Sequence, residues 1–304
     1  MPQRLSSLRG KTYLITGATS GTGFQTARIL LSKGAQVVML NRNNAKSEAT
    51  KAALLEEFGD KALISFVQMD LSDLSSVRQA AKKLLDTVPK IEALICNAAI
   101  AQVPKRKRTK EGFESQLGTN HYGHFLLSGL LFERIAKSKG RIVVVASLGY
   151  NLGLKTIQFD DLNWDKKYNP NSAYSQSKLA QMMFAYELQD RLTSSDKKVE
   201  VYVCHPGSSA TSLITTSGNL MTRFIFWLMT KTPIVQSAHK GAYPAVMCAT
   251  ETGLAQRALY GPTGTLGFVG PVGTCNLNAH AYQKDTMAKL WDVSEEATGF
   301  HWSL

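Results

Sequence analysis

The sequence is poor in cysteine and has no long hydrophobic run. Its four cysteines (Cys96, Cys204, Cys248 and Cys275) form no C-x-x-C pair, and its first residues contain no apolar signal region. Free thiols in a reducing compartment are the simplest interpretation. The longest dense apolar run, 220–229, falls well short of the ~20 residues that a membrane-spanning helix needs. These absences predict a cytoplasmic protein without an integral membrane segment.

Acidic residues are also scarce, because 35 lysines and arginines face only 23 aspartates and glutamates, which gives a net charge of +12. The basic residues concentrate in the run PKRKRTK at 104–110. Such a run is compatible with a phosphate-binding patch, but this one begins at a proline and has no interleaved aromatic side chains on which bases could stack. We interpret it as a solvated loop, expect no nucleic-acid partner, and leave contact with an acidic partner open.

The order of apolar segments predicts one α/β domain over residues 1–304. The β-like runs lie at 12–16, 35–40, 62–69, 91–96, 141–147 and 199–204, and helical patterns separate them at 22–32, 44–58, 74–86, 112–136 and 173–192. Several of these runs are apolar throughout, which is typical of a parallel sheet covered by helices on both faces. We therefore expect a single-domain, doubly wound Rossmann fold with ligand crevices at the carboxyl ends of its strands. An apolar insertion around 208–234 and a C-terminal helical extension around 279–298 complete it.

A glycine-rich corner, TGATSGTG at 16–23, joins the first β-like run to the first helix. Its spacing, Gly17-x-x-x-Gly21-x-Gly23, matches neither the GxGxxG dinucleotide fingerprint nor the GxxxxGK P-loop. Glycine lets a ligand come close to the backbone, and a helix N-terminus offers free N–H groups and a partial positive charge. The corner therefore predicts a diphosphate site.

The sequence YSQSK places Tyr174 and Lys178 one turn apart on the same face of a helix. A phenol near its reference pKa of ~10 is a poor base at neutral pH. A lysine ammonium ~4 Å away can lower that pKa far enough for proton transfer. Because such pairs are common on helix surfaces, their meaning depends on the residues that join them.

Further polar residues fall at the carboxyl ends of the β-like runs, where the site of an α/β protein belongs. Ser147 ends one such run, Asn97 follows another, and Pro206 and Gly207 follow a third. Asn120 lies on the helix that precedes the run ending at Ser147. In this order, and together with the glycine corner and the Tyr-Lys pair, these residues resemble the short-chain dehydrogenase/reductase family over nearly the whole chain.

The resemblance implies a nicotinamide dinucleotide cofactor and a catalytic set of Tyr174, Lys178, Ser147 and Asn120. In this set Tyr174 exchanges a proton with the substrate oxygen and Ser147 hydrogen-bonds the same oxygen. Lys178 lowers the pKa of Tyr174 and holds the nicotinamide ribose, and Asn120 supports a water path to Lys178. The cofactor-binding residues that the resemblance implies are Gly17, Thr19, Ser20, Gly21, Thr22, Gly23, Asn41, Arg42, Asp70, Leu71, Asn97, Ala98, Tyr174, Lys178, Pro206 and Gly207.

Two residues depart from the family pattern, because Thr22 stands in place of a common apolar residue and Ala99 in place of a glycine. A metal is not expected. His121 and His124 lie close together on one helix, but no cysteine or carboxylate cluster complements them, and in the family this segment is a packing helix.

Within the family, two branches share features with this chain. The segments 109–127, 157–168 and 290–299 are similar to the retinol-dehydrogenase-like reductases and also to the light-dependent protochlorophyllide reductases. The stretch from Ser147 to Tyr174 is too short for the longer insertion of the second group, and no cysteine follows soon after Lys178. We therefore expect a general carbonyl reductase or alcohol dehydrogenase.

The end of the second β-like run predicts which dinucleotide is bound. A fold of this kind that binds NAD carries an Asp or Glu there, ~20 residues past the glycine motif, to bind the adenosine ribose. Here Asn41 and Arg42 follow the run, and the first acidic residue is Glu48. A guanidinium binds a 2′-phosphate through two charge-assisted hydrogen bonds, whereas a carboxylate repels it. We predict NADP(H), with Arg42 as the main 2′-phosphate ligand and Asn41 or Lys46 assisting.

Together these features predict an NADP(H)-dependent oxidoreductase that transfers a hydride between nicotinamide and the carbonyl or alcohol carbon of an apolar aldehyde, ketone or alcohol. The aromatic residues of 208–234, among them Phe224 and Trp227, indicate either a lid over a bulky, uncharged substrate or a helix packed on the core or on a partner. Two other functions stay open: a protochlorophyllide-reductase-like C=C reductase, and a catalytically silent NADP-binding sensor. Homo-oligomer formation also stays open.

Overall fold

The computed structural model describes residues 5–209 and 235–304 of the chain. Its strands are β1 (Thr12–Thr16), β2 (Gln36–Asn41), β3 (Ile64–Gln68), β4 (Ala93–Cys96), β5 (Arg141–Val145), β6 (Glu200–Cys204), β7 (Leu259–Pro262) and β8 (Val272–Cys275). Its α-helices are α1 (Gly21–Leu31), α2 (Asn44–Phe58), α3 (Leu74–Thr87), α4 (Ser115–Leu117), α5 (Gly123–Lys137), α6 (Pro170–Leu192), α9 (Ala238–Thr250) and α10 (Lys284–Thr298). The apolar segment expected around 208–234 lies outside the described residues from position 210 onward.

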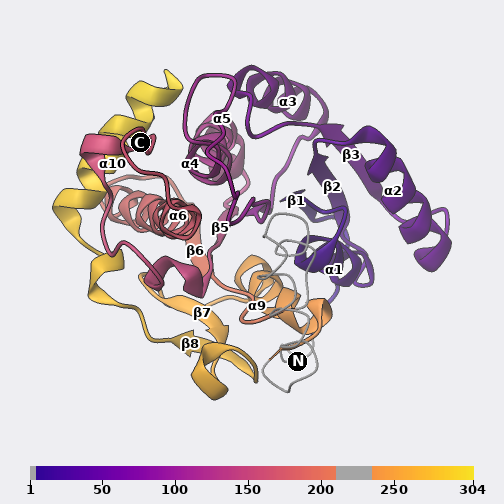
Figure 1. Cartoon of the computed structure of the whole chain (residues 1–304). Helices are drawn as coiled ribbons and strands as arrows, with labels where there is room; N and C mark the ends of the chain where they lie inside the picture. Colours follow the sequence, from indigo (N-terminus) through magenta and orange to yellow (C-terminus); the bar gives the residue numbers. More distant parts are fainter. Residues whose placement is uncertain (1–4, 210–234) are drawn as a thin grey trace.

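The strands form one eight-stranded sheet in the order β3-β2-β1-β4-β5-β6-β7-β8 (Figure 1). Neighbouring strands from β3 to β7 pair in parallel, and β8 pairs antiparallel with β7. The order reverses between β1 and β4, so the carboxyl ends of these two strands flank the crevice in which doubly wound sheets bind their ligands. The expected single-domain, mainly parallel Rossmann fold is confirmed.

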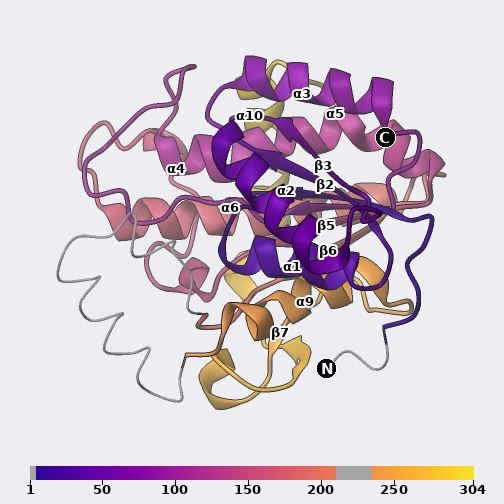
Figure 2. The same cartoon turned by 90° about the vertical axis from the view of Figure 1, so that its right-hand side faces the viewer.

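Helices cover both faces of the sheet, with α3, α5, α6 and α10 on one side and α1, α2 and α9 on the other (Figures 1 and 2). Successive strand residues alternate between the two cores. In β1, for example, Leu14 packs into the first core, whereas Tyr13 and Ile15 pack into the second. This double burial explains why the strands are apolar throughout rather than alternating with polar residues.

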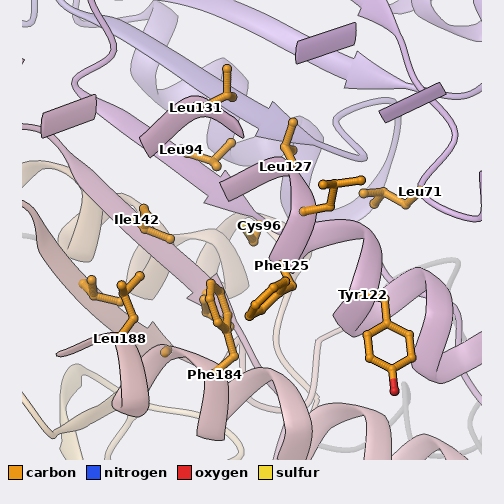
Figure 3. Packing of buried hydrophobic residues seen from close by; sticks show 14 of the residues in the cluster. Leu71, Leu94, Cys96, Tyr122, Phe125, Leu127, Leu131, Ile142, Phe184 and Leu188 are labelled. Atoms are coloured by element: carbon orange, nitrogen blue, oxygen red, sulfur yellow. The ribbon is translucent and has the colours of Figure 1, made fainter. Parts of the chain in front are cut away.

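An aromatic cluster holds the C-terminal part of the chain against the first core. The rings of Phe125 on α5 and Phe184 on α6 pack edge to face with centroids 5.3 Å apart (Figure 3). Trp291 on α10 lies 5.2 Å from Phe125, and Trp302 lies 5.6 Å from it. Offset and edge-to-face contacts of this kind add to the free energy gained by burial.

The structure differs from the sequence-based expectation in three places. The helix expected from residue 112 begins at Ser115 and contains a π-helical turn, Gly118–Tyr122, which carries Asn120. The apolar runs do not predict strands β7 and β8. Each has only four residues, which is too short for a clear apolar pattern. The sequence pattern does not predict helix α9 either. This helix contains Pro244, and a proline inside an apolar stretch argues against a helix when only the sequence is known.

The basic run 104–110 pairs with acidic side chains of its own chain. Arg106 and Arg108 both form salt bridges with Asp165, and Lys110 Nζ lies 2.8 Å from Asp73 Oδ2. Part of its charge is therefore compensated by carboxylates elsewhere in the chain. Separately, in the part of the chain that the structure describes, no helix is long and apolar enough to span a bilayer.

We expect that Phe125→Ala lowers the free energy of unfolding by about 3–5 kcal/mol, because it removes a fully buried ring from the aromatic cluster. Urea unfolding followed by fluorescence measures this loss. The matched control is Leu63→Ala, since Leu63 is 56% exposed and its truncation leaves no cavity. A loss for Phe125→Ala as small as that of the control would show that the cluster contributes little.

Candidate active site

The corner between β1 and α1 fits an anionic ligand. Gly17 has a φ of +68°, and a Cβ there would lie 2.9 Å from the Cα of Ala98. A side chain is therefore excluded by both backbone strain and space. Helix α1 begins at Gly21 without an acidic residue in its first turn. Its N-terminal N–H groups and partial positive charge suit a diphosphate.

Asn97 ties this corner to the end of β4. Its Nδ2 donates hydrogen bonds to the carbonyl oxygens of Thr16 (2.9 Å) and Gly17 (3.2 Å). Thr22 Oγ1 donates to Asn97 Oδ1 at 3.0 Å, so the threonine that departs from the family pattern has a partner in this network. A Cβ on Gly23 would lie 2.4 Å from Asn97 Nδ2. Gly23 is thus required for the packing of the corner itself.

A cavity of about 970 Å³, here called the main cavity, opens at the carboxyl ends of the strands. Apart from Gly23 and Asn120, every site residue expected from the sequence lines it: Gly17, Thr19, Ser20, Gly21, Thr22, Asn41, Arg42, Asp70, Leu71, Asn97, Ala98, Ser147, Tyr174, Lys178, Pro206 and Gly207. The structure therefore brings together the carboxyl ends of six strands, β1 to β6, and two residues of helix α6. Sequence reasoning missed other lining residues, including Gly149, Leu152 and Phe268. Of these, only Gly149 carried a signal, its position just after Ser147.

At the end of β2, Arg42 and Asn41 have different environments. Arg42 is exposed and lines the main cavity, as does Lys46. Among the described residues, no carboxylate forms a salt bridge with Arg42. Asn41 is buried, accepts a hydrogen bond from the Ala18 N–H (2.8 Å) and donates one to Ser47 Oγ (3.2 Å). The Asn41 side chain therefore shapes the corner, and its assistance to a 2′-phosphate stays a prediction.

Ser147 and Tyr174 meet in the main cavity. Ser147 lies just past β5, and its Oγ accepts a hydrogen bond from the Gly149 N–H at 3.1 Å. A Cβ on Gly149 would lie 2.8 Å from the Tyr174 ring, so this glycine leaves room for the phenol. Burial raises the pKa of Tyr174, and the hydrogen bond with Ser147 lowers it in part. The side chain is therefore a neutral phenol at neutral pH, ready to donate a proton.

Lys178 behaves differently from the sequence-based expectation. Its Nζ donates hydrogen bonds to the Val145 carbonyl (3.1 Å) and to Gln181 Oε1 (2.9 Å). Burial lowers its pKa to about 7. Removing a charged group from water is costly, so burial favours the neutral form of both side chains. The expected lowering of the Tyr174 pKa by Lys178 is therefore not found in this structure, where burial raises that pKa.

Asn120 is fully buried and does not line the main cavity. Its Oδ1 accepts from the Ile100 N–H and its Nδ2 donates to the Ile100 carbonyl and to Ser177 Oγ, each at 2.9 Å. These contacts hold the loop after β4 against α6. The water path expected for this residue stays a prediction. His121 and His124 are paired with Ser294 Oγ (2.7 Å) and Thr16 Oγ1 (2.9 Å).

The chain is similar in sequence and fold to known proteins. Residues 11–159 match the family model described as short chain dehydrogenase. The chain is 37% identical to retinol dehydrogenase 14 of Homo sapiens, over 96% of this chain and 87% of that protein. Among solved structures, an uncharacterized protein from Mycobacterium Paratuberculosis is 35% identical, with a TM-score of 0.79 over 99% of this chain and 98% of that one.

A 3-ketoacyl-(acyl-carrier-protein) reductase from Brucella melitensis, solved with NADH, is 25% identical, with a TM-score of 0.59 over 80% of this chain and 92% of that one. The fold and the main cavity thus define a dinucleotide-binding oxidoreductase. The chain belongs to the short-chain dehydrogenase/reductase family, in its retinol-dehydrogenase-like branch.

The buried lysine gives a pH-dependent prediction. The pKa of Lys178 is about 7 in the folded protein against 10.5 ordinarily, so between these values the unfolded chain binds this proton more tightly. The resulting destabilisation is fully present below about pH 7 and is lost as the pH rises towards 10.5. The unmutated protein therefore gains stability as the pH rises from about 7 to 10.5, whereas Lys178→Met has no such group. The free energy of unfolding of Lys178→Met minus that of the unmutated protein should decrease over this range. Urea unfolding at several pH values measures it, with Lys51→Met as the control, and a pH-independent difference would contradict the burial of the charge.

Proposed function

We propose that the protein is an NADP(H)-dependent carbonyl reductase or alcohol dehydrogenase for apolar substrates. The observation that carries the proposal is the meeting of Ser147 and Tyr174 in the same cavity as the glycine-rich corner and Arg42. A proton donor, an oxygen-binding hydroxyl and a dinucleotide cradle are the parts that carbonyl reduction requires. A protein that only bound the dinucleotide would need the cradle alone.

Bound NADPH supplies the hydride that reaches the carbonyl carbon. Tyr174 donates its phenolic proton to the carbonyl oxygen, and its raised pKa keeps that proton in place until negative charge develops on the oxygen. Ser147 donates a hydrogen bond to the same oxygen. The Gly149 N–H donates to its Oγ and holds this hydroxyl in place. Both contacts strengthen in the transition state, so they act mainly on kcat.

Lys178 and Asn120 position the elements that carry Ser147 and Tyr174. Lys178 Nζ is anchored to the Val145 carbonyl at the end of β5, close in sequence to Ser147, and we assign it to the nicotinamide ribose. Asn120 contacts Ser177, whose Oγ donates to the Tyr174 carbonyl at 2.8 Å. It therefore positions the turn of α6 that carries Tyr174.

The lining of the main cavity supports an apolar substrate. Its lining includes the apolar residues Leu148, Leu152, Phe268, Ile100 and Ala101. Apolar linings with few polar groups favour uncharged, hydrophobic ligands. The human relative is named for the dehydrogenation of retinol, an apolar alcohol, which agrees with this class without identifying the substrate.

Arg42 supports NADP(H) rather than NAD(H). It is the exposed cation at the end of β2, where an NAD-specific protein of this fold carries a carboxylate. Lys46, which also lines the cavity, is the assisting cation. Both can approach a 2′-phosphate without first breaking a salt bridge within the described residues.

Removing the proton donor tests the chemistry. Tyr174→Phe should lower kcat at least ~100-fold in a panel of aldehydes and ketones with NADPH, the low end for a positioned acid–base group. The matched control is Tyr186→Phe, because Tyr186 lies on the same helix and donates to the Ala258 carbonyl (3.3 Å) outside the main cavity. Turnover of Tyr174→Phe close to that of the control would refute the assignment.

Reversing one charge tests the cofactor choice. The unmutated protein should prefer NADPH to NADH at least about tenfold in kcat/KM, because charge-assisted hydrogen bonds contribute ~1.5–3 kcal/mol. Arg42→Asp should invert this preference while keeping turnover with NADH. Lys51→Asp makes the same change on α2 outside the cavity lining and should leave the preference unchanged. Equal kcat/KM for both cofactors in the unmutated protein would show that Arg42 binds no phosphate.

A further inference from the structure

Two basic segments of the chain form one surface, which we call the basic surface. The segments are 104–108, before α4, and 164–168, before α6, and they lie at the same end of the molecule (Figure 2). Together they contain one carboxylate, Asp165, and six cations, Lys105, Arg106, Lys107, Arg108, Lys166 and Lys167. All six cations are exposed. The surface therefore carries a strong net positive charge.

Hydrogen bonds and salt bridges fasten the two segments to each other. The Tyr168 hydroxyl of the second segment donates to the Val103 carbonyl, just before the first segment, at 2.6 Å. Arg106 and Arg108 of the first segment both form salt bridges with Asp165 of the second. The basic surface is thus ordered before any partner binds, so binding costs little conformational entropy.

Four lysines of the basic surface have no carboxylate partner. They are Lys105, Lys107, Lys166 and Lys167, and within the residues that the structure describes none of them forms a salt bridge. None of them lines the main cavity either, so they lie outside the proposed cofactor and substrate site. Exposed charges of one sign attract a partner of the opposite sign. The four lysines therefore point to an anionic partner that covers this surface from outside.

The basic surface borders the main cavity. Ala101 and Gln102, which lie shortly before the first segment, line this cavity. Asn171, which lies shortly after the second segment, lines it as well and is exposed. A partner that binds the lysines therefore lies beside the main cavity.

An exposed leucine lies in the same region. Leu152 lines the main cavity and is 76% exposed. A Cβ on Gly153 would lie 3.4 Å from the Cα of Ser172, so this loop lies against the first turn of α6, which follows the second basic segment. Leucine beside cations suits the boundary between the head groups and the acyl chains of a bilayer. The lysines alone would fit any extended anion, and Leu152 favours a bilayer.

We propose that the basic surface docks the protein on anionic phospholipid bilayers. The lysines contact the anionic head groups, and Leu152 enters the apolar boundary beneath them. The main cavity then opens beside the bilayer. This adds a source for the substrate, and only that part rests on the proposed function: long apolar ketones and alcohols dissolve in a bilayer in preference to water.

Sedimentation with vesicles tests the docking without turnover. The probes are vesicles of phosphatidylcholine that contain about one third phosphatidylserine, and vesicles of phosphatidylcholine alone. The protein should sediment with the first and stay in solution with the second. Sodium chloride at about 0.5 M should release it, because salt screens exposed charges. Equal binding to both vesicles, or no binding to either, would overturn the proposal.

Two pairs of lysine variants isolate the surface. Lys105→Gln combined with Lys107→Gln should weaken binding to the anionic vesicles about thirtyfold, since each lysine near such a membrane contributes about fivefold. The matched control combines Lys61→Gln with Lys90→Gln. Both of these lysines are exposed and precede the amino ends of β3 and β4, at the opposite edge of the sheet from the main cavity. The control should bind as tightly as the unmutated protein, and equal losses in the two pairs would contradict a defined surface.

A leucine variant separates a bilayer from an acidic protein. Leu152→Asn should weaken binding to the anionic vesicles about tenfold, as expected when a leucine side chain leaves water on binding. Leu63→Asn is the matched control, because Leu63 is 56% exposed and directly precedes β3, and it should bind as the unmutated protein does. Polyglutamate, which offers charge without an apolar layer, should bind Leu152→Asn and the unmutated protein equally. Unchanged vesicle binding by Leu152→Asn would overturn the bilayer in favour of an acidic protein.

Reduction of dodecanone dissolved in the anionic vesicles tests the supply of substrate. With NADPH, Lys105→Gln combined with Lys107→Gln should reduce vesicle-bound dodecanone more slowly than the unmutated protein but reduce butanone in solution at the same rate, which also shows that the variant is folded. Reduction of ketones without any binding to anionic vesicles would overturn the docking and leave the proposed function intact. Docking without reduction of any ketone would instead overturn the proposed function and retain the docking.

Discussion

The hydrogen bonds between Thr16 and Asn97 join the two strand ends on which the site depends. The backbone N–H groups of Asn97 and Ala98 both donate to Thr16 Oγ1 at 2.9 Å, and the Asn97 side chain donates back to the corner. From Thr16 the bonded contacts continue to the catalytic helix in the order His124, Asn120, Ser177 and Tyr174. Because His124 Nδ1 faces the Asn120 carbonyl, Nε2 is the acceptor for Thr16. One buried network thus positions both the dinucleotide corner and Tyr174.

Burial is the second constraint, and it sets the charge of the site. It raises the pKa of Tyr174 and lowers that of Lys178 to about 7. Each group is therefore pushed towards its neutral form, as expected for ionisable groups removed from water. A neutral phenol beside a hydroxyl that already accepts from Gly149 is arranged to donate protons. The phenol thus has the protonation state that reduction of a carbonyl requires.

The sequence predicted the parts of the molecule that depend on local patterns. The first six strands follow from their apolar runs, and the gathering of Ser147, Tyr174 and Lys178 follows from their positions at strand ends and on one helix face. The environment of Asn41 could not be predicted, since its partners Ala18 and Ser47 meet it only after folding. The same holds for Lys178, whose ammonium is bound by the Val145 carbonyl from another element.

The claim that this cavity catalyses hydride transfer to a carbonyl is tested most directly by isotope transfer. NADPH that carries deuterium at the transferable position of its nicotinamide is incubated with the protein and a long-chain ketone, and the alcohol is analysed by mass spectrometry. We expect one deuterium on the carbinol carbon of the product, bound there stereospecifically. Oxidation of the NADPH without deuterium in the alcohol, or no alcohol at all across the ketone and aldehyde panel, would contradict the proposed function.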